Sequence, residues 1–330
     1  LCSGPLLLSL FPFLVVSRLL IQCPESDLLA LPFRLAAWGI GIRTPCAARV
    51  LCIGFLGGFA PAASAAAQAV RTGQLTAEEA DALLPACSCS GPSCVVLTVG
   101  QSLLGSAELG VLLFASQITA NYLTAALLNR FAGVRSVKLG SAAPASPAPP
   151  RLDEILADAA ITYCKLCGFI LFFRMLAAGA GALLPADAGT LCSILLEVCS
   201  GCDLASRTGR WGSLLCCAAL SVQGLSVLLQ VRTICPPEMT LRPLYRSRLL
   251  HLPLSLALFY LLLPGGEADV FSTLPARVLL MRRVPPDCAL LVFAVCCMAA
   301  CTLRSGIRQV EQKQMARNAG GCCINSKTLL

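Results

Sequence analysis

The chain has 330 residues, of which 57% are hydrophobic and 13% are charged, with a formal net charge of +8. A soluble domain carries about 25% charged residues, so charged groups cannot cover a surface of the usual kind here. We therefore expect a polytopic membrane protein and not a soluble enzyme. The basic residues fall between apolar runs, as the positive-inside rule predicts for loops, which argues against nucleic-acid binding.

Apolar runs predict the helices, because a membrane-spanning helix needs about 20 residues. Residues 46–70, 107–129 and 159–185 meet this length comfortably. Residues 92–104 and 248–263 are short enough to be half-helices or re-entrant segments, and residues 28–40 and 189–199 are too short to cross. In chain order, the predicted spanning or part-spanning segments are 5–22, 46–70, 92–104, 107–129, 159–185, 211–231, 248–263 and 286–304.

A helix start outside these runs is predicted at "LTAEEADALL", residues 75–84. Thr76 suits the N-cap position, and Glu79 follows three residues later, which together form a capping box. Gly73 suits the end of the preceding helix. This predicts a tight connection between two helices, followed by a return into the apolar region.

A Pro/Ala/Ser-rich segment at 137–151 divides the chain into similar halves. "ARVLCIGFLGG" (48–58) is similar to "GSLLCCAALSVQG" (212–224), and a threonine-led turn follows each. The first turn, 71–82, is acidic and the second, 232–248, is basic, so inverted repeats would place them on opposite faces. We expect an all-α fold of two related, inverted repeats with broken or re-entrant helices. The predicted units are a first repeat (1–136), a linker (137–151), a second repeat (152–304) and a basic polar tail (305–330).

Helix-breaking residues interrupt the apolar runs at "GGFAP" (57–61), "CSCSGPSC" (87–94) and "SVQGLS" (221–226). Broken helices of this kind build substrate sites in secondary transporters, and polar residues on 107–129 form a stripe that could line such a site. The alternative is kinked helices in which small residues allow close packing, with the stripe bonding to a neighbouring helix. The candidate substrate-binding residues are Gly57, Gly58, Pro61, Ser88, Ser90, Gly91, Ser93, Gln117, Asn121, Gln223, Gly224 and Ser226.

The remaining polar and sulfur-containing residues give weaker signals. Arg18 lies in an apolar run and needs a partner, water or the headgroup region, and Glu197 is a candidate for coupling to protons or cations. Most of the 21 cysteines lie in apolar runs, where cysteine behaves as a small hydrophobic residue. The CxxC pairs at 164–167 and 199–202 are further apart than the about 12–20 residues of a zinc site. We expect no metal and no cofactor, and a thiol-disulfide role remains a weaker alternative.

Two motifs carry a resemblance to a known family. "GGFAPAASAAAQAVRTGQLTAEEADALLPACSCSGPSCVVLTVG" (57–100) and "ALSVQGLSVLLQVRTICPPEMTLRPLYRSRLLH" (219–251) occur in the expected order. The chain resembles the YlbJ family of sporulation integral membrane proteins, which carry the nucleoside-recognition or Gate domain, over about residues 6–263. An Asn-Asn pair of that family is replaced here by Ser88-Cys89, and a histidine by Leu228 or Leu229.

The resemblance implies a multi-pass cell-membrane protein of a spore-forming bacterium, with one more helix upstream of Leu1. It implies a transporter of a small polar solute that is needed for formation of the spore cortex. The lost Asn-Asn pair favours the alternative, a non-transporting scaffold or regulator of spore envelope assembly. The expected partners are the lipid bilayer, the solute, and a second copy or other sporulation membrane proteins.

Overall fold

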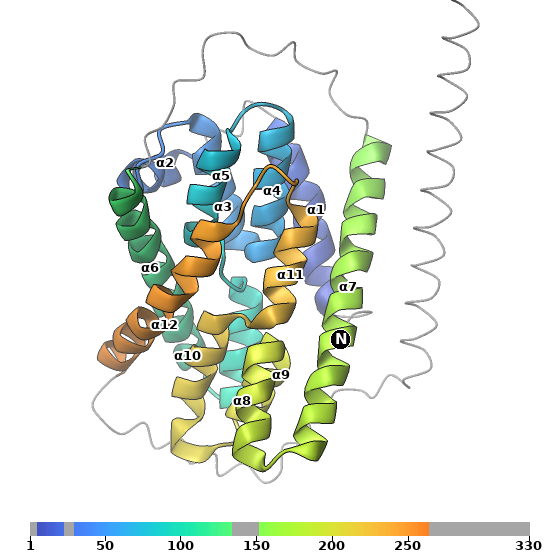
Figure 1. Ribbon diagram of the computed structural model, residues 1–330, viewed down its shortest axis with the longest axis vertical. Coiled ribbons are helices and arrows are strands. Elements are labelled where there is room, and N and C mark those ends of the chain that lie inside the picture. Colours follow the sequence, from blue (N-terminus) through green and yellow to red (C-terminus); the bar gives the residue numbers. More distant parts are fainter. Residues whose placement is uncertain (1–4, 23–29, 134–151, 264–330) are drawn as a thin grey trace, which may run out of the picture.

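The computed structural model describes residues 5–22, 30–133 and 152–263, and all regular elements in these ranges are helices (Figure 1). The predicted linker, the segment 286–304 and the tail lie outside the described residues. Three helical segments are long and apolar enough to cross a membrane: Ala107–Ala132, Asp153–Leu183 and Gly209–Ile234. The all-α class is confirmed, and these segments agree with membrane association.

Within each described range, the helices follow one another with short connections. The first half comprises α1 (Pro5–Gln22), α2 (Leu31–Gly39), α3 (Pro45–Gly57), α4 (Phe59–Arg71), α5 (Ala77–Cys87), the π-helix η2 (Ser93–Leu104) and α6 (Ala107–Ala132). The second half comprises α7 (Leu152–Leu183), α8 (Ala186–Leu196), α9 (Val198–Ala205), the short 3-10 helix η3 (Gly209–Trp211), α10 (Gly212–Val222), α11 (Gly224–Ile234) and α12 (Arg242–Leu262).

The prediction of one spanning helix over 46–70 is wrong, because the chain turns back at Gly58. The backbone φ of Gly58 is +86°, a conformation that favours glycine. Helices α3 and α4 then pack against each other as a hairpin, in which a Cβ on Gly54 would lie 3.2 Å from Cβ of Ala62. Helices α8 and α9 form a second hairpin, where Gly201 approaches the backbone of Ile194.

Two further helices are interrupted without folding back. Helix α5 is separated from η2 by residues 88–92, and α10 is separated from α11 at Gln223. The predicted break at 87–93 and the predicted half-helix at 92–104 are thus present. The segment 248–263 is not a half-helix, because α12 starts earlier, at Arg242, and has 21 residues.

Helix α4 lies in the interior of the bundle. Seven of its alanines, between Ala60 and Ala69, are at most 1% exposed, and the helix contacts α1, α3, α5 and α11. Alanine favours helix formation, and its small side chain lets neighbouring backbones approach closely. Small residues serve the same purpose between η2 and α6, where a Cβ on Gly100 would lie within 3 Å of the Gly110 backbone.

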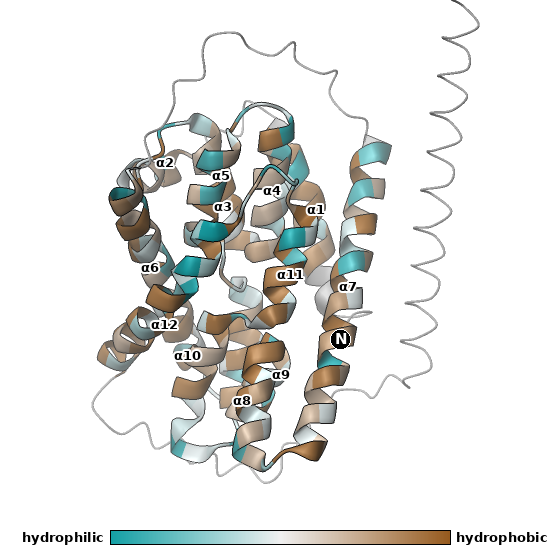
Figure 2. Ribbon diagram, in the orientation of Figure 1, coloured by the Kyte–Doolittle hydropathy of each residue, from teal (hydrophilic) through white to brown (hydrophobic). Residues whose placement is uncertain are grey.

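The acidic turn and the basic turn lie at the same end of the bundle, so the prediction that they occupy opposite faces is wrong. The Asp81 carboxylate accepts hydrogen bonds from the backbone N–H groups of Thr240 (2.8 Å) and Leu241 (3.1 Å). The capping box of Thr76 and Glu79 is confirmed at the start of α5. Figure 2 shows hydrophilic residues on the upper turns of α5, α7 and α12, whereas α8 and α9 are mainly apolar.

Candidate functional site

The interrupted ends of α5 and α10 meet in the middle of the bundle. The Ser88 hydroxyl donates to Oε1 of Gln223 at 3.0 Å, and Nε2 of Gln223 donates to the Ser88 carbonyl at 2.7 Å. Asn121, on α6, donates through Nδ2 to the same carbonyl at 3.2 Å. Two breaks that are 135 residues apart in the sequence are therefore joined by a reciprocal hydrogen-bonded pair.

A buried arginine completes this junction. Arg248, on α12, is 8% exposed, and no carboxylate pairs with it among the described residues. Its guanidinium donates to the carbonyls of Ser88 (3.3 Å) and Ser221 (3.5 Å) and to Oδ1 of Asn121 (3.0 Å). The two carbonyls lie at the C-terminal ends of α5 and α10, where the helix dipole places partial negative charge. Two helix ends thus take the place of a counter-ion.

A second group of polar side chains lies beside the arginine. Nε2 of Gln117 donates to the Ser221 hydroxyl at 2.9 Å and to the Cys217 carbonyl at 3.2 Å. Nε2 of His251 is 3.2 Å from the Gln117 carbonyl, while Nδ1 of the same buried ring has no hydrogen-bond partner among the described residues. The Ser221 hydroxyl also contacts the hydroxyl of Ser255. These residues extend the network from α6 through α10 to α12.

Each hairpin places its turn against one of the breaks. The Phe59 N–H donates to the Cys89 carbonyl at 2.7 Å, and a Cβ on Gly58 would lie 2.7 Å from the backbone nitrogen of Gly91. In the second half, a Cβ on Gly224 would lie 3.0 Å from the backbone nitrogen of Glu197. The backbones therefore approach so closely that only glycine fits at these positions.

Glu197 sits at the turn of the second hairpin as a helix cap. Its carboxylate accepts from the N–H groups of Cys199 (2.9 Å) and Ser200 (2.7 Å), and the residue is 2% exposed. A carboxylate at a helix N-terminus is stabilised by the free N–H groups and by the helix dipole. In this structure Glu197 therefore caps α9 at the turn of the second hairpin. Its predicted role in coupling to protons or cations stays a prediction.

The structure separates the candidate residues into three groups. Ser88, Gln117, Asn121 and Gln223 share one network. The predicted glycines Gly58, Gly91 and Gly224 make the close backbone contacts described above. The remaining candidates lie outside the network. Gly57 and Pro61 pack within the first hairpin, and Ser226 accepts a hydrogen bond from Gln230. Ser90 is buried without a hydrogen bond to described residues, and Ser93 is exposed.

The junction is filled by its own side chains. We define it as Ser88, Gln117, Asn121, Ser221, Gln223, Arg248 and His251, all of which are at most 8% exposed. The predicted convergence of the breaks is present, whereas the polar groups there bond to one another. Buried polar groups that are paired in this way hold a specific arrangement, and a ligand would have to replace some of these bonds.

Sequence analysis missed Arg248, Ser221 and His251. Arg248 and His251 lie one helical turn apart, so α12 presents both on the same side. The spacing of Arg248 and His251 in "RLLH" (248–251) could have indicated a shared helix face. Because the helix is predicted to begin at residue 248, Arg248 is interpreted as a loop residue.

Comparisons of the chain with family models, with curated proteins and with solved structures found no match. The resemblance to the YlbJ family therefore stays a prediction that depends on the motifs at 57–100 and 219–251.

Proposed function

We propose that the protein is a membrane transporter of a small polar solute, and that the junction is its solute-binding site. The observation that carries this proposal is Arg248, a buried guanidinium without a carboxylate partner among the described residues, held between two interrupted helices. Ionisable groups inside membrane proteins are costly and usually mark a solute or ion pathway. We infer a solute with a negatively charged or acceptor-rich group.

The order of elements supports inverted repeats of the kind found in secondary transporters. Each half contains a long helix, a hairpin, an interrupted helix and a further helix: α1, α3/α4, α5/η2 and α6 correspond to α7, α8/α9, α10/α11 and α12. This correspondence differs from the predicted similarity of 48–58 to 212–224, which would match α3 with α10. The hairpin α3/α4 lies in the upper part of the bundle and α8/α9 in the lower part (Figure 1). Transporters with inverted repeats bind solute where interrupted helices meet, and move one half against the other.

The strained backbone of Gln223 also supports a site that changes state. Its φ is +63°, which costs about 1–2 kcal/mol for a residue other than glycine. The hydrogen bonds to Ser88 hold this conformation. Strain of this kind persists where surrounding contacts enforce it and is common at binding sites and switches. An acceptor-rich solute that competes for the Nε2 donor of Gln223 would release it.

The second candidate is a non-transporting membrane scaffold, which the filled junction favours. Mutually bonded side chains stabilise a fixed arrangement without any ligand. The replacement of the family's Asn-Asn pair by Ser88-Cys89 points the same way. A role in sporulation, in either case, depends on the family resemblance, and counting heat-resistant spores after gene deletion tests it.

Uptake by proteoliposomes separates the two candidates. The purified protein is reconstituted and screened with radiolabelled nucleosides, amino acids and small carboxylates, alongside Arg248→Gln, Arg248→Lys and a control, Arg207→Gln. Arg207 is exposed and pairs with Asp203, away from the junction. We expect uptake by the wild type and the control, loss in Arg248→Gln and partial activity in Arg248→Lys.

No uptake of any solute by the wild type, or equal uptake by Arg248→Gln, would contradict the transport proposal. Size-exclusion chromatography of each variant shows whether it has folded.

A further inference from the structure

A second charged site lies away from the junction, in a pocket of about 130 Å³. Its walls come from α1, α4, α7 and α11, which contact one another as neighbours. Three cationic side chains and one carboxylate line it, namely Arg18, Arg71, Lys165 and Asp158, which gives a formal charge of +2.

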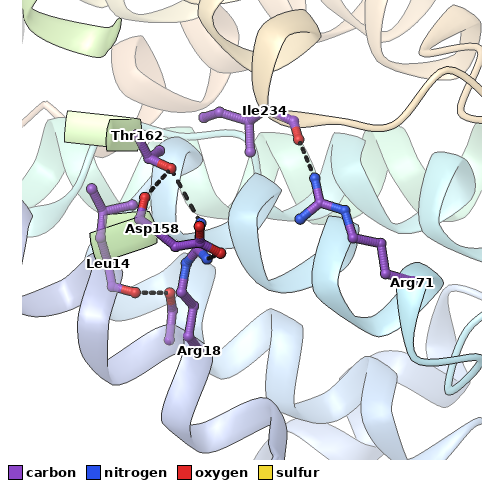
Figure 3. A network of polar contacts seen from close by, with 7 residues as sticks. Leu14, Arg18, Arg71, Asp158, Thr162 and Ile234 are labelled. Atoms are coloured by element: carbon purple, nitrogen blue, oxygen red, sulfur yellow. Dashed lines mark hydrogen bonds and ion pairs between the residues drawn. The ribbon is translucent and has the colours of Figure 1, made fainter. Parts of the chain in front are cut away.

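Arg18 forms the buried part of this pocket. It is 8% exposed, and its guanidinium donates to Asp158 at 2.6 Å and to the Thr162 hydroxyl at 3.2 Å. Figure 3 shows this arginine beside Asp158 and Thr162, with Arg71 nearby. Nε of Arg18 is buried and has no hydrogen-bond partner in the part of the chain that the structure describes. An unpaired N–H of a buried guanidinium is expensive unless an acceptor reaches it.

Two exposed cations lie at the same pocket. Arg71 donates to the Ile234 carbonyl at 3.4 Å (Figure 3), and its other N–H groups make no hydrogen bond within the described ranges. Lys165 makes no hydrogen bond or ion pair with the residues that the structure describes. Asp158, Thr162 and Lys165 follow one another at helical spacing on α7, so they face the same side. One carboxylate cannot neutralise three cations.

We propose that this pocket binds the phosphate group of a molecule with net negative charge, either an anionic lipid headgroup or a soluble phosphate. Guanidinium groups bind phosphate oxygens through paired hydrogen bonds, and an ammonium adds a point charge. The unpaired N–H of Arg18 and the free donors of Arg71 and Lys165 supply these contacts. This proposal does not depend on the transport function.

The position of the pocket suits a membrane interface. Helices α4 and α11 end beside it and α7 begins near it (Figure 1). Basic residues in the same part of the bundle include Arg34 on α2, Arg130 in the last turn of α6 and Arg232 in the last turn of α11. Basic residues mark the cytoplasmic side of membrane proteins, and basic pockets between helices on that side bind anionic lipid headgroups.

Native mass spectrometry of the full chain in neutral detergent tests the proposal. The protein is titrated with phosphatidylglycerol, with phosphatidylcholine and with inorganic phosphate against a chloride control. The main variant, Arg71→Gln/Lys165→Gln, changes two exposed residues and should fold. The matched control, Arg207→Gln/Arg210→Gln, removes two exposed cations at the opposite end. We expect about fivefold weaker phosphatidylglycerol binding for each pocket charge removed, and no change in the control.

Asp158→Asn should change phosphate binding in the opposite direction. It removes the negative charge that competes with the ligand, so phosphate binding should become stronger by about fivefold. Residues with a purely structural role would weaken binding in both variants. Binding of phosphatidylglycerol alone assigns the site to a lipid headgroup, and binding of inorganic phosphate assigns it to a soluble ligand. Equal binding of phosphatidylcholine, or equal loss in the control variant, overturns the proposal.

Discussion

Replacing Gln223 by alanine tests the link between the two interrupted helices. Gln223→Ala removes the bond to the Ser88 carbonyl and leaves the Ser88 hydroxyl, which is 3% exposed, without its acceptor. The carbonyl keeps the donors of Asn121 and Arg248 and stays satisfied. The unpaired hydroxyl and the lost side-chain volume together cost about 2–4 kcal/mol of unfolding free energy.

A glycine at the same position separates strain from hydrogen bonding. Gln223→Gly loses the same bonds but relieves the positive φ, so it should be about 1 kcal/mol more stable than Gln223→Ala. Unfolding is followed by tryptophan fluorescence during titration with sodium dodecyl sulfate in mixed micelles. The control is Gln230→Ala, which loses the same side-chain volume at an equally buried position but only a hydrogen bond to Ser226 within α11, so it should cost less than Gln223→Ala.

A double-mutant cycle isolates the pair itself. Ser88→Ala and Gln223→Ala should be coupled by about 1 kcal/mol or more, because each removes the partner of the other. Wild-type stability of Gln223→Ala, or additive effects in the cycle, would refute the proposed link between the breaks.

Three further changes test other parts of the structure. Gly58→Ala should lose at least about 2 kcal/mol, since its Cβ would meet a backbone nitrogen at 2.7 Å, whereas Gly168→Ala, in open space on α7, should keep wild-type stability in the same titration. Asp81→Asn weakens the hydrogen bonds that hold Thr240, and hydrogen exchange at its amide should accelerate while core amides stay protected. Glu197→Ala removes the cap of α9 and should cost about 1–2 kcal/mol, and an unchanged midpoint would show that the cap is dispensable.

Local signals predicted local structure well. The capping box at Thr76 and Glu79 fixes a helix start through contacts three residues apart, so it can be read from the sequence. The helix breaks at 57–61 and 221–226 could also be predicted. The path of the chain after each break could not be predicted. At Gly58 the chain folds back into a hairpin, whereas at Gln223 the helix is only interrupted. That difference depends on which elements pack on either side.

The junction was predictable only in part, for the same reason. Ser88, Gln117, Asn121 and Gln223 are polar residues in apolar surroundings, which marks them in the sequence. Arg248 lies where an apolar run begins, so it reads as a loop charge. Its role comes from carbonyls of α5 and α10 that are far away in the chain. The end at which the turns 71–82 and 232–248 meet is likewise set by long-range contacts.

The composition of α4 has a consequence for how this protein tolerates change. Its seven alanines are buried among four neighbouring helices, so a larger side chain at most of these positions would overpack against a neighbour. These alanines carry no chemistry of the junction, yet they should be among the positions at which random substitution is least accepted. Natural variation in relatives should therefore concentrate on the outer helices, while α4 keeps small side chains because of the limited space around it.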